Sequence, residues 1–244
     1  MKTTTKPRQL VVGGVEVSIL HKSIKNLHLG VYPPQGRVRV AAPLKMSDDA
    51  IRLAIVTRLA WIKRQKSKFA EQPRETKREM VRGESHFFLG KRYRLRIVPG
   101  TGAAKVVLPN NTSMELHMPA SSTSEQRERA LQRWYRAQLK ELVPPLLAKW
   151  QPLLGVTASE WGIKRMRTKW GTCNTEARRI WLNLELAKKP VQCLEYILVH
   201  ELTHLLEPSH NARFVSLMDR FMPKWQFYRE MLNRLPVKHE GWKV

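Results

Sequence analysis

The sequence predicts an α+β protein, with strands concentrated in the first half of the chain and helices in the second. Apolar and polar residues alternate, as in half-buried strands, between residues 9 and 42 and again from 87 to 98. Apolar residues recur at helical spacing after residue 120. We therefore expect a β-rich basic region over residues 1–120, with one long helix, and a second region over 121–244. The second region reads as helix, β-hairpin, helix and C-terminal helix.

Charge is the outlying feature of the composition. The 244 residues include 44 Lys and Arg against 20 Asp and Glu, a formal net charge of +24. A field of this size attracts anions, so nucleic acid or a nucleotide is an expected partner of the basic surface. Hydrophobic residues make up 42% of the chain, which is enough for a buried core and excludes a fully disordered protein.

Cysteine content and hydropathy predict a cytoplasmic protein without a membrane partner. The two cysteines, Cys173 and Cys193, give no disulfide framework and fit a reducing compartment. The basic first residues lead into no long apolar run, so no signal peptide is predicted. The most apolar helical stretch, residues 51–62, contains Arg52 and Arg58 and is too short and too charged to span a bilayer.

The first region contains a predicted hairpin followed by a predicted helix. Gly13-Gly14 can adopt the positive φ values of a two-residue hairpin turn, and an alternating strand follows from Val15. Ser47 is the expected cap of one continuous helix over residues 48–70. The charged segment 71–82 reads as a helix end or a linker.

A strand is predicted over residues 87–98, with arginines on one face. This row consists of Arg92, Arg94 and Arg96. It is either a binding surface for a polyanion or an ordinary solvated sheet face. Two short strands are expected after it, Lys105–Leu108 and Glu115–Met118.

A second long helix is expected to begin at residue 122. Ser122 and Glu125 have the spacing of a capping box. Pro144-Pro145 should kink or break this helix, because proline lacks the backbone N–H that a helix interior uses.

One segment carries the chemistry: His200-Glu201-Leu202-Thr203-His204 has the pattern H-E-x-x-H. Pro190 suits a first helical turn. His200 and His204 then lie one turn apart, about 6 Å along the helix axis, where both imidazoles can bind one zinc ion. Leucines at helical spacing form an apolar ridge along the same helix: Leu194, Leu198, Leu202 and Leu205.

Glu201 is the predicted catalytic residue. It is turned by about 100° from His200, so it can hydrogen-bond a metal-bound water instead of binding the metal. Zinc lowers the pKa of such a water from about 15.7 to about 7. Glu201 would then take its proton as general base and pass it to the leaving group.

His210 is the predicted third metal ligand, because a catalytic zinc keeps three protein ligands and one open position. Pro208 should end the first helix and let the chain turn back toward the metal, with a next helical segment over residues 210–220. Glu230 is the competing ligand. The spacing resembles that of metzincins, but Glu207 stands where they carry glycine, so that class is not assigned.

Several further stretches resemble a known family. Arg167–Cys173 is similar to the pattern R-x-x-W-G-S-C, with Thr172 in place of serine. The other stretches are Ile180–Leu184, Leu194–His204, His210–Phe214, Pro223, Ile24–Leu27 and Phe88–Tyr93. Together they resemble the YgjP-like family of M48-type zinc metallopeptidases, relatives of the SprT and WLM groups.

The resemblance implies a zincin-like fold, in which a twisted sheet covers an active-site helix. It also implies His200, His204 and His210 as zinc ligands and Glu201 as the catalytic residue. The strand near residues 170–172 would border the cleft, where an edge strand can pair with an extended peptide. We interpret Trp170 as a core aromatic and Cys173 as a small buried residue, the latter not a metal ligand.

We therefore expect a zinc-dependent hydrolase with one catalytic Zn²⁺, a metallopeptidase acting on a peptide or protein substrate. Two alternatives stay open. The same site could serve a metal-dependent nucleoside triphosphate pyrophosphohydrolase, or the chain could be a non-catalytic basic protein that binds nucleic acid and holds a structural metal. The group that stabilises the transition-state oxyanion is Lys169, Arg213 or Tyr228. Sequence leaves the substrate, the physiological metal and the oligomeric state undetermined.

Overall fold

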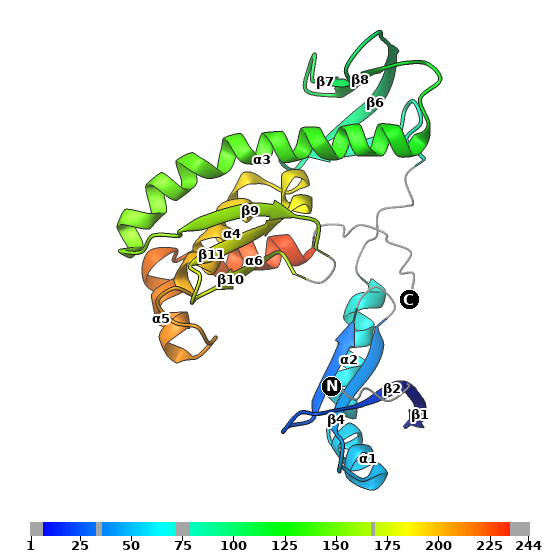
Figure 1. Cartoon of the computed structure of the whole chain (residues 1–244), viewed down its shortest axis with the longest axis vertical. Helices are drawn as coiled ribbons and strands as arrows, with labels where there is room; N and C mark the ends of the chain where they lie inside the picture. Colours follow the sequence, from blue (N-terminus) through cyan, green and yellow to red (C-terminus); the bar gives the residue numbers. More distant parts are fainter. Residues whose placement is uncertain (1–6, 33–35, 72–78, 167–168, 235–244) are drawn as a thin grey trace. The chain divides into compact units, whose positions relative to one another are not determined.

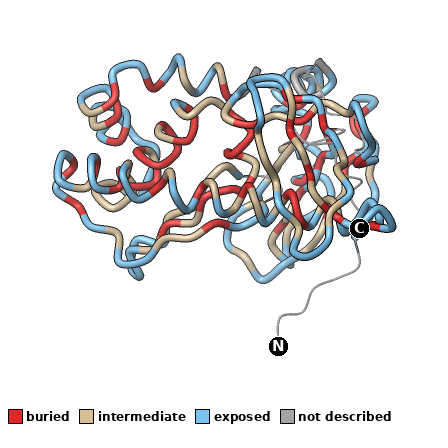
Figure 2. Tube along the Cα trace, turned by 90° about the horizontal axis from the view of Figure 1, so that it is seen from above, coloured by how far each residue is buried: buried red, intermediate tan, exposed pale blue. Residues whose placement is uncertain are grey.

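The computed structural model describes residues 7–32, 36–71, 79–166 and 169–234, which form an α+β fold as the sequence predicts (Figure 1). Two compact units divide the chain, the first ending at Arg74 and the second starting at Glu75. Buried positions alternate with exposed ones along the elements of each unit (Figure 2). None of the helices in the described ranges is both long and apolar enough to cross a membrane.

The division between the units therefore falls near residue 75, whereas the sequence placed a boundary near residue 120. The strands between residues 85 and 118 share one buried cluster with the helices that follow. Leu95 and Leu116, for example, belong to the same core as Leu139 and Leu198. Composition changes near residue 120, but packing joins what lies on either side of that point.

The first unit is a four-stranded sheet with two helices. Its strand order is β1-β2-β4-β3, and β2 and β4 are parallel. The glycine turn is as predicted, because Gly13 and Gly14 have φ values of 56° and 76° and Val12 pairs with Val15. The elements are β1 (Arg8–Val12), β2 (Val15–Lys22), β3 (His28–Tyr32), β4 (Arg37–Pro43), α1 (Asp48–Val56) and α2 (Leu59–Glu71).

The single helix predicted over residues 48–70 is two helices. Its start is as expected, since the Ser47 hydroxyl accepts a hydrogen bond from the Ala50 N–H. However, α1 ends at Val56, where the Thr57 hydroxyl donates to the carbonyl of Ala54. A side chain that bonds back to the preceding turn competes with the helical ladder, and α2 starts only at Leu59.

The second unit holds two further sheets and the remaining helices. One sheet has the order β5-β6-β8-β7, and the other has the order β10-β11-β9 with β10 at its edge. Its elements are β5 (Ser85–Phe88), β6 (Lys91–Pro99), β7 (Lys105–Val107), β8 (Ser113–Met118), α3 (Ser124–Leu154), β9 (Glu160–Lys164), β10 (Gly171–Asn174), β11 (Arg179–Asn183), the 3₁₀ helix η1 (Leu184–Lys188), α4 (Val191–Thr203), α5 (Ala212–Phe221) and α6 (Trp225–Arg234).

The arginine row on β6 is exposed, as the alternation predicted, but two of its three side chains have partners. The Arg94 guanidinium donates to the carbonyl of Gly83 at 2.9 Å. Arg96 lies 3.7 Å from the Glu115 carboxylate. The row therefore offers a polyanion less unpaired charge than the sequence suggests.

Helix α3 has its N-cap one residue later than predicted, and it continues past the two prolines that were expected to kink or break it. Its capping box is formed by Thr123 and Gln126, one residue later than expected. Pro144 and Pro145 do not break it. Both prolines are exposed, so water can bond the carbonyls that they leave free, while buried neighbours such as Leu139 anchor the opposite face.

The turn between β5 and β6 packs against the start of α4. The backbone N–H groups of Leu89 and Gly90 donate to the carbonyls of Ala187 and Lys188, at 2.9 and 3.2 Å. Gly90 has a φ of 81°, and a Cβ at this position would lie 2.7 Å from Cγ of Pro190, the N-cap of α4. This close approach of backbone to ring fixes where α4 begins.

A second contact holds α4 from the side. The Glu195 carboxylate accepts hydrogen bonds from the indole N–H of Trp150 and from the Lys149 ammonium, both at 2.7 Å. These bonds tie α4 to α3. Helix α4 also packs against β10, β11 and α6, so it is held by elements distant in sequence.

We predict that Gly90→Ala destabilises the protein more than Gly83→Ala does. Both glycines have similar positive φ values, 81° and 87°, but an added Cβ at Gly83 meets nothing within 4 Å. The shared backbone strain costs about 1–2 kcal/mol. The contact with Pro190 should add about 1–3 kcal/mol at Gly90 alone. Urea unfolding of both variants measures the difference, and equal losses of stability would contradict this role for Gly90.

Candidate metal centre

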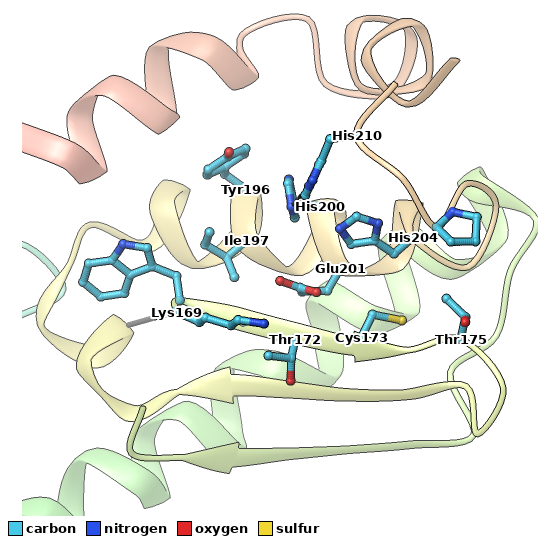
Figure 3. A pocket seen from close by; sticks show the side chains of 13 residues that line it. Lys169, Thr172, Cys173, Thr175, Tyr196, Ile197, His200, Glu201, His204 and His210 are labelled. Carbon is cyan, nitrogen blue, oxygen red and sulfur yellow. Dashed lines mark hydrogen bonds between the residues drawn. The ribbon is translucent and has the colours of Figure 1, made fainter. Parts of the chain in front are cut away.

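Helix α4 has a buried apolar face and a neighbouring face that carries His200 and His204. Three leucines of the predicted apolar ridge, Leu194, Leu198 and Leu202, are at 0% exposure, whereas Leu205 is half-buried and lies beyond the end of the helix. This face packs into the core and orients the helix, while His200 and His204 lie on the neighbouring face, one turn apart (Figure 3).

The end of α4 does not depend on Pro208, contrary to the sequence prediction. The helix ends at Thr203, with His204 as its C-cap. The chain then turns tightly, since the N–H of Leu206 and that of Glu207 both donate to the Thr203 carbonyl. The turn is thus complete before the proline is reached.

His210 lies in the loop after this turn and before α5. The predicted helix over residues 210–220 begins two residues later, at Ala212, with Asn211 as its N-cap. The Asn211 side chain accepts from the Phe214 N–H at 3.0 Å. The start of α5 therefore fixes the direction in which the loop presents His210 to the two histidines of α4.

The imidazoles of His200, His204 and His210 form one cluster. One ring nitrogen from each lies within 4.8 Å of the others, and the cluster can hold a metal ion. Nε2 of His200 and Nε2 of His210 are 2.9 Å apart. In a tetrahedral zinc site with Zn–N bonds of about 2.0–2.1 Å, two nitrogens are about 3.3 Å apart. The geometry therefore fits such an ion.

Hydrogen bonding at His204 leaves one of its ring nitrogens available for a metal. Nδ1 of His204 lies 3.1 Å from the Glu207 carbonyl. A carbonyl only accepts, so Nδ1 carries the proton and Nε2 keeps its lone pair. Nδ1 of His200 is buried, with no partner among the described residues.

Burial also favours the neutral form of His200 and His204. It lowers the pKa of His200 to about 3, with smaller contributions from the neighbouring His204 and His210 and from Arg229. The pKa of His204 is lowered by burial as well. Phe214 supplies part of the apolar surroundings, since its ring centroid lies 4.7–4.9 Å from all three imidazoles. Neutral imidazole is the form that binds metal.

Glu201 points away from the core into the space between α4 and β10 (Figure 3). It is 5% exposed. Burial raises its pKa to about 8, and the positive charge of Lys169 acts in the opposite direction. The carboxylate is packed so closely on β10 that a Cβ at Gly171 would lie 2.5 Å from its Oε1.

A cavity of about 440 Å³ adjoins the cluster. The three histidines and Glu201 line it from the side of α4. Lys169 and His210 are exposed, so the cavity reaches the surface. The rest of its lining comes from β10 and the residues that flank it, from α4 and from the turn after it: Lys169, Trp170, Gly171, Thr172, Cys173, Thr175, Tyr196, Ile197 and Pro208.

The structure separates the residues that the sequence left as alternatives. His210, and not Glu230, belongs to the cluster of potential metal ligands found in the described ranges. Among the three candidates for stabilising an oxyanion, Lys169 lines the cavity, whereas Arg213 and Tyr228 do not.

Three further residues line the cavity. Trp170 packs on the core, as predicted, and its half-buried side chain also lines the cavity. Cys173, which was predicted to be buried, is half-buried, and burial raises the pKa of its thiol to about 11. Tyr196 was missed, although it lies one turn before His200 on the same helix face, with its ring 6.0 Å from the imidazole. That spacing was the available signal.

Comparison with known proteins identifies the class. The model of the YgjP-like metallopeptidase domain matches residues 26–235. The match covers most of the chain, which is therefore a metal-dependent hydrolase of the peptidase class. The chain belongs to the YgjP-like metallopeptidase family. A metallopeptidase needs a divalent metal ion, typically zinc, and the three imidazoles fit that requirement.

One solved structure similar to the chain is the crystal structure of the metallopeptidase zymogen of Pyrococcus abyssi abylysin. It shares 23% identity, and the alignment covers 39% of this chain and 99% of that one with a TM-score of 0.35. The search of curated proteins gives no match. The family assignment stands on the match over residues 26–235.

We predict that the metal-free protein loses stability as the pH rises from 6.5 to about 8. The Glu201 carboxyl titrates near 4.5 in the unfolded chain but near 8 in the folded protein. The folded state thus binds more protons in this window, so the free energy of unfolding falls with rising pH. His200 contributes the opposite slope, but only between about 3 and 6.5.

Urea unfolding in a chelator at several pH values measures this dependence. Glu201→Gln removes the carboxyl and should flatten the curve between pH 6.5 and 8. An unchanged slope in that variant would show that Glu201 is not the group responsible.

We further predict that Gly171→Ala lowers hydrolytic activity by on the order of 100-fold or more, because a misplaced catalytic group costs about that much. The added methyl would have to displace the Glu201 carboxylate, since it meets Oε1 at 2.5 Å and Cγ at 2.8 Å. Metal content should not change, because the nearest atoms to the added methyl belong to Glu201 and not to the three histidines. Gly155→Ala is a control outside the cavity. Full activity in Gly171→Ala would mean that Glu201 does not need its observed position.

Proposed function

We propose that this protein is a zinc metallopeptidase in which His200, His204 and His210 hold one catalytic Zn²⁺ and Glu201 is the general base. The observation that carries the proposal is the juxtaposition of three imidazoles with a buried carboxylate at an open cavity. When bound, zinc would polarise the scissile carbonyl and acidify the attacking water.

Glu201 would perform both proton transfers. Its carboxylate takes a proton from the attacking water and then delivers that proton to the leaving amine. A pKa raised by burial suits the second step, because the residue then holds a proton near neutral pH. The contact with Gly171 limits the directions in which the carboxylate can turn.

Strand β10 would align the substrate. It is the edge strand of its sheet, paired with β11 on one side, and it borders the cavity with Gly171, Thr172 and Cys173. An extended peptide can add to such an edge through main-chain hydrogen bonds. This arrangement would place a peptide bond between β10 and the histidine cluster.

Chemistry of the ligands favours this function over the two alternatives. The group of potential metal ligands in the described ranges consists of imidazoles, which suit zinc, whereas Mg²⁺ at polyphosphate sites prefers oxygen. A structural zinc site is closed by four protein ligands, but this cluster has three and opens to a cavity.

Binding of nucleic acid or nucleotides by the basic surface stays a prediction. The net charge of +24 supports it, while the partly paired arginine row on β6 does not add to it. The salt dependence of binding to labelled oligonucleotides would measure it, since each phosphate contact steepens the slope.

We predict that Glu201→Gln abolishes peptide cleavage while zinc stays bound, because the amide cannot take a proton from water. His210→Ala should lose zinc and activity together. Elemental analysis and an assay on denatured casein measure the two properties. Glu176→Gln is a matched control, since this glutamate is exposed in the turn after β10. Cleavage that persists in Glu201→Gln would refute the mechanism.

A further inference from the structure

Lys169 is the one lysine or arginine among the described residues that line the cavity. It immediately precedes the Trp170-Gly171 segment that leads into β10, and its side chain extends toward Glu201 (Figure 3). The ammonium group is close enough to Glu201 to lower the pKa of that carboxyl. A positive charge therefore lies in the same cavity as Glu201.

No carboxylate in the described ranges forms an ion pair with this lysine. Glu201 is the one carboxylate in the cavity lining, but it is buried against Gly171 and occupied by its role as base. The side chain of Lys169 is exposed, so its charge faces whatever enters.

The backbone that carries Lys169 is held by one buried side chain. Asn183, which is 4% exposed, donates from Nδ2 to the carbonyls of Met166 and Lys169, at 3.0 and 2.7 Å. Its Oδ1 accepts from the Met166 N–H at 3.3 Å, and its own N–H donates to the Trp170 carbonyl at 2.9 Å. The backbone at Met166, Lys169 and Trp170 is thus hydrogen-bonded to Asn183, at the end of β11.

We propose that Lys169 is a specificity-determining residue that selects substrates with a carboxylate next to the scissile bond. This inference rests on the proposed peptidase function and names its substrate class as acidic peptides. The backbone of Lys169 is anchored, its ammonium group is exposed, and no carboxylate in the described ranges forms an ion pair with it. Such an arrangement can bind an anionic side chain of a substrate. The net charge of +24 would favour encounter with the same substrates.

Cleavage-site mapping on a proteome-derived peptide library tests the proposal over many candidate substrates at once. Sites cut by the zinc-loaded protein should be enriched in Asp or Glu at one position beside the cut bond. If the carboxylate recognised is instead the peptide C-terminus, the cuts will fall at a fixed distance from that end. Sites without either feature would overturn the proposal.

Matched peptides that carry Glu, Gln or Lys at the enriched position give the second measurement. The wild-type kcat/KM should be on the order of tenfold higher for Glu than for Gln, as expected for a charge-assisted contact. Lys169→Met should bring this ratio to about one, and Lys169→Glu should reverse the preference toward Lys. Lys140→Met, at an exposed lysine of α3 outside the cavity, should keep the wild-type ratio.

Two further outcomes separate this proposal from the function on which it builds. If Lys169→Met lowers kcat equally for the Glu and Gln peptides, the lysine acts on the reacting carbonyl and the proposal is wrong. Binding of labelled peptides to Glu201→Gln, followed by fluorescence anisotropy, needs no catalysis. Charge-dependent binding that Lys169→Met removes would support the subsite even if no peptide were cleaved, and charge-independent binding would refute it.

Discussion

The imidazoles of His200, His204 and His210 face one point, and the rest of the site is arranged around them. A protonated imidazole has no lone pair to offer a metal, so a metal site needs neutral rings. Burial beside Phe214 favours the neutral form of His200 and His204, because it lowers the pKa of both rings. The same burial acts in the opposite direction on Glu201, where it raises the pKa of the carboxyl to about 8. Removal from water thus shifts the pKa of both kinds of group, because it disfavours the charged form of each.

Neutral rings are useful only if the helix that carries them is held in place. Helix α4 is fixed at its start by the Gly90–Pro190 contact and at its side by Glu195. Its other neighbour, β10, lies so close that only glycine fits opposite Glu201. Each of these contacts joins segments far apart in sequence, so the geometry of the cluster reflects the packing of the whole unit. Lys169, which lines the cavity beside this frame, is the residue that we propose selects the substrate.

The sequence predicted the strands and helix α4 well, because both depend on local periodicity. It was less successful where a boundary depended on a single side chain. Thr57 divides a predicted helix by bonding back to the preceding turn, and α4 ends before Pro208 is reached. Exposed prolines left α3 unbroken because water and a buried face compensate for the lost bonds. The domain boundary was displaced because composition does not report which strands share a core.

By itself, the sequence determined which residues are available for the chemistry and that His200 and His204 share one face. A helix repeats every 3.6 residues, so this relation needs no tertiary information. Only the tertiary structure decided that His210 joins them in place of Glu230, that Gly171 packs on Glu201 and that Lys169 faces the same cavity. Those relations depend on how loops and strands from distant parts of the chain are packed, and packing distances are not encoded in local periodicity.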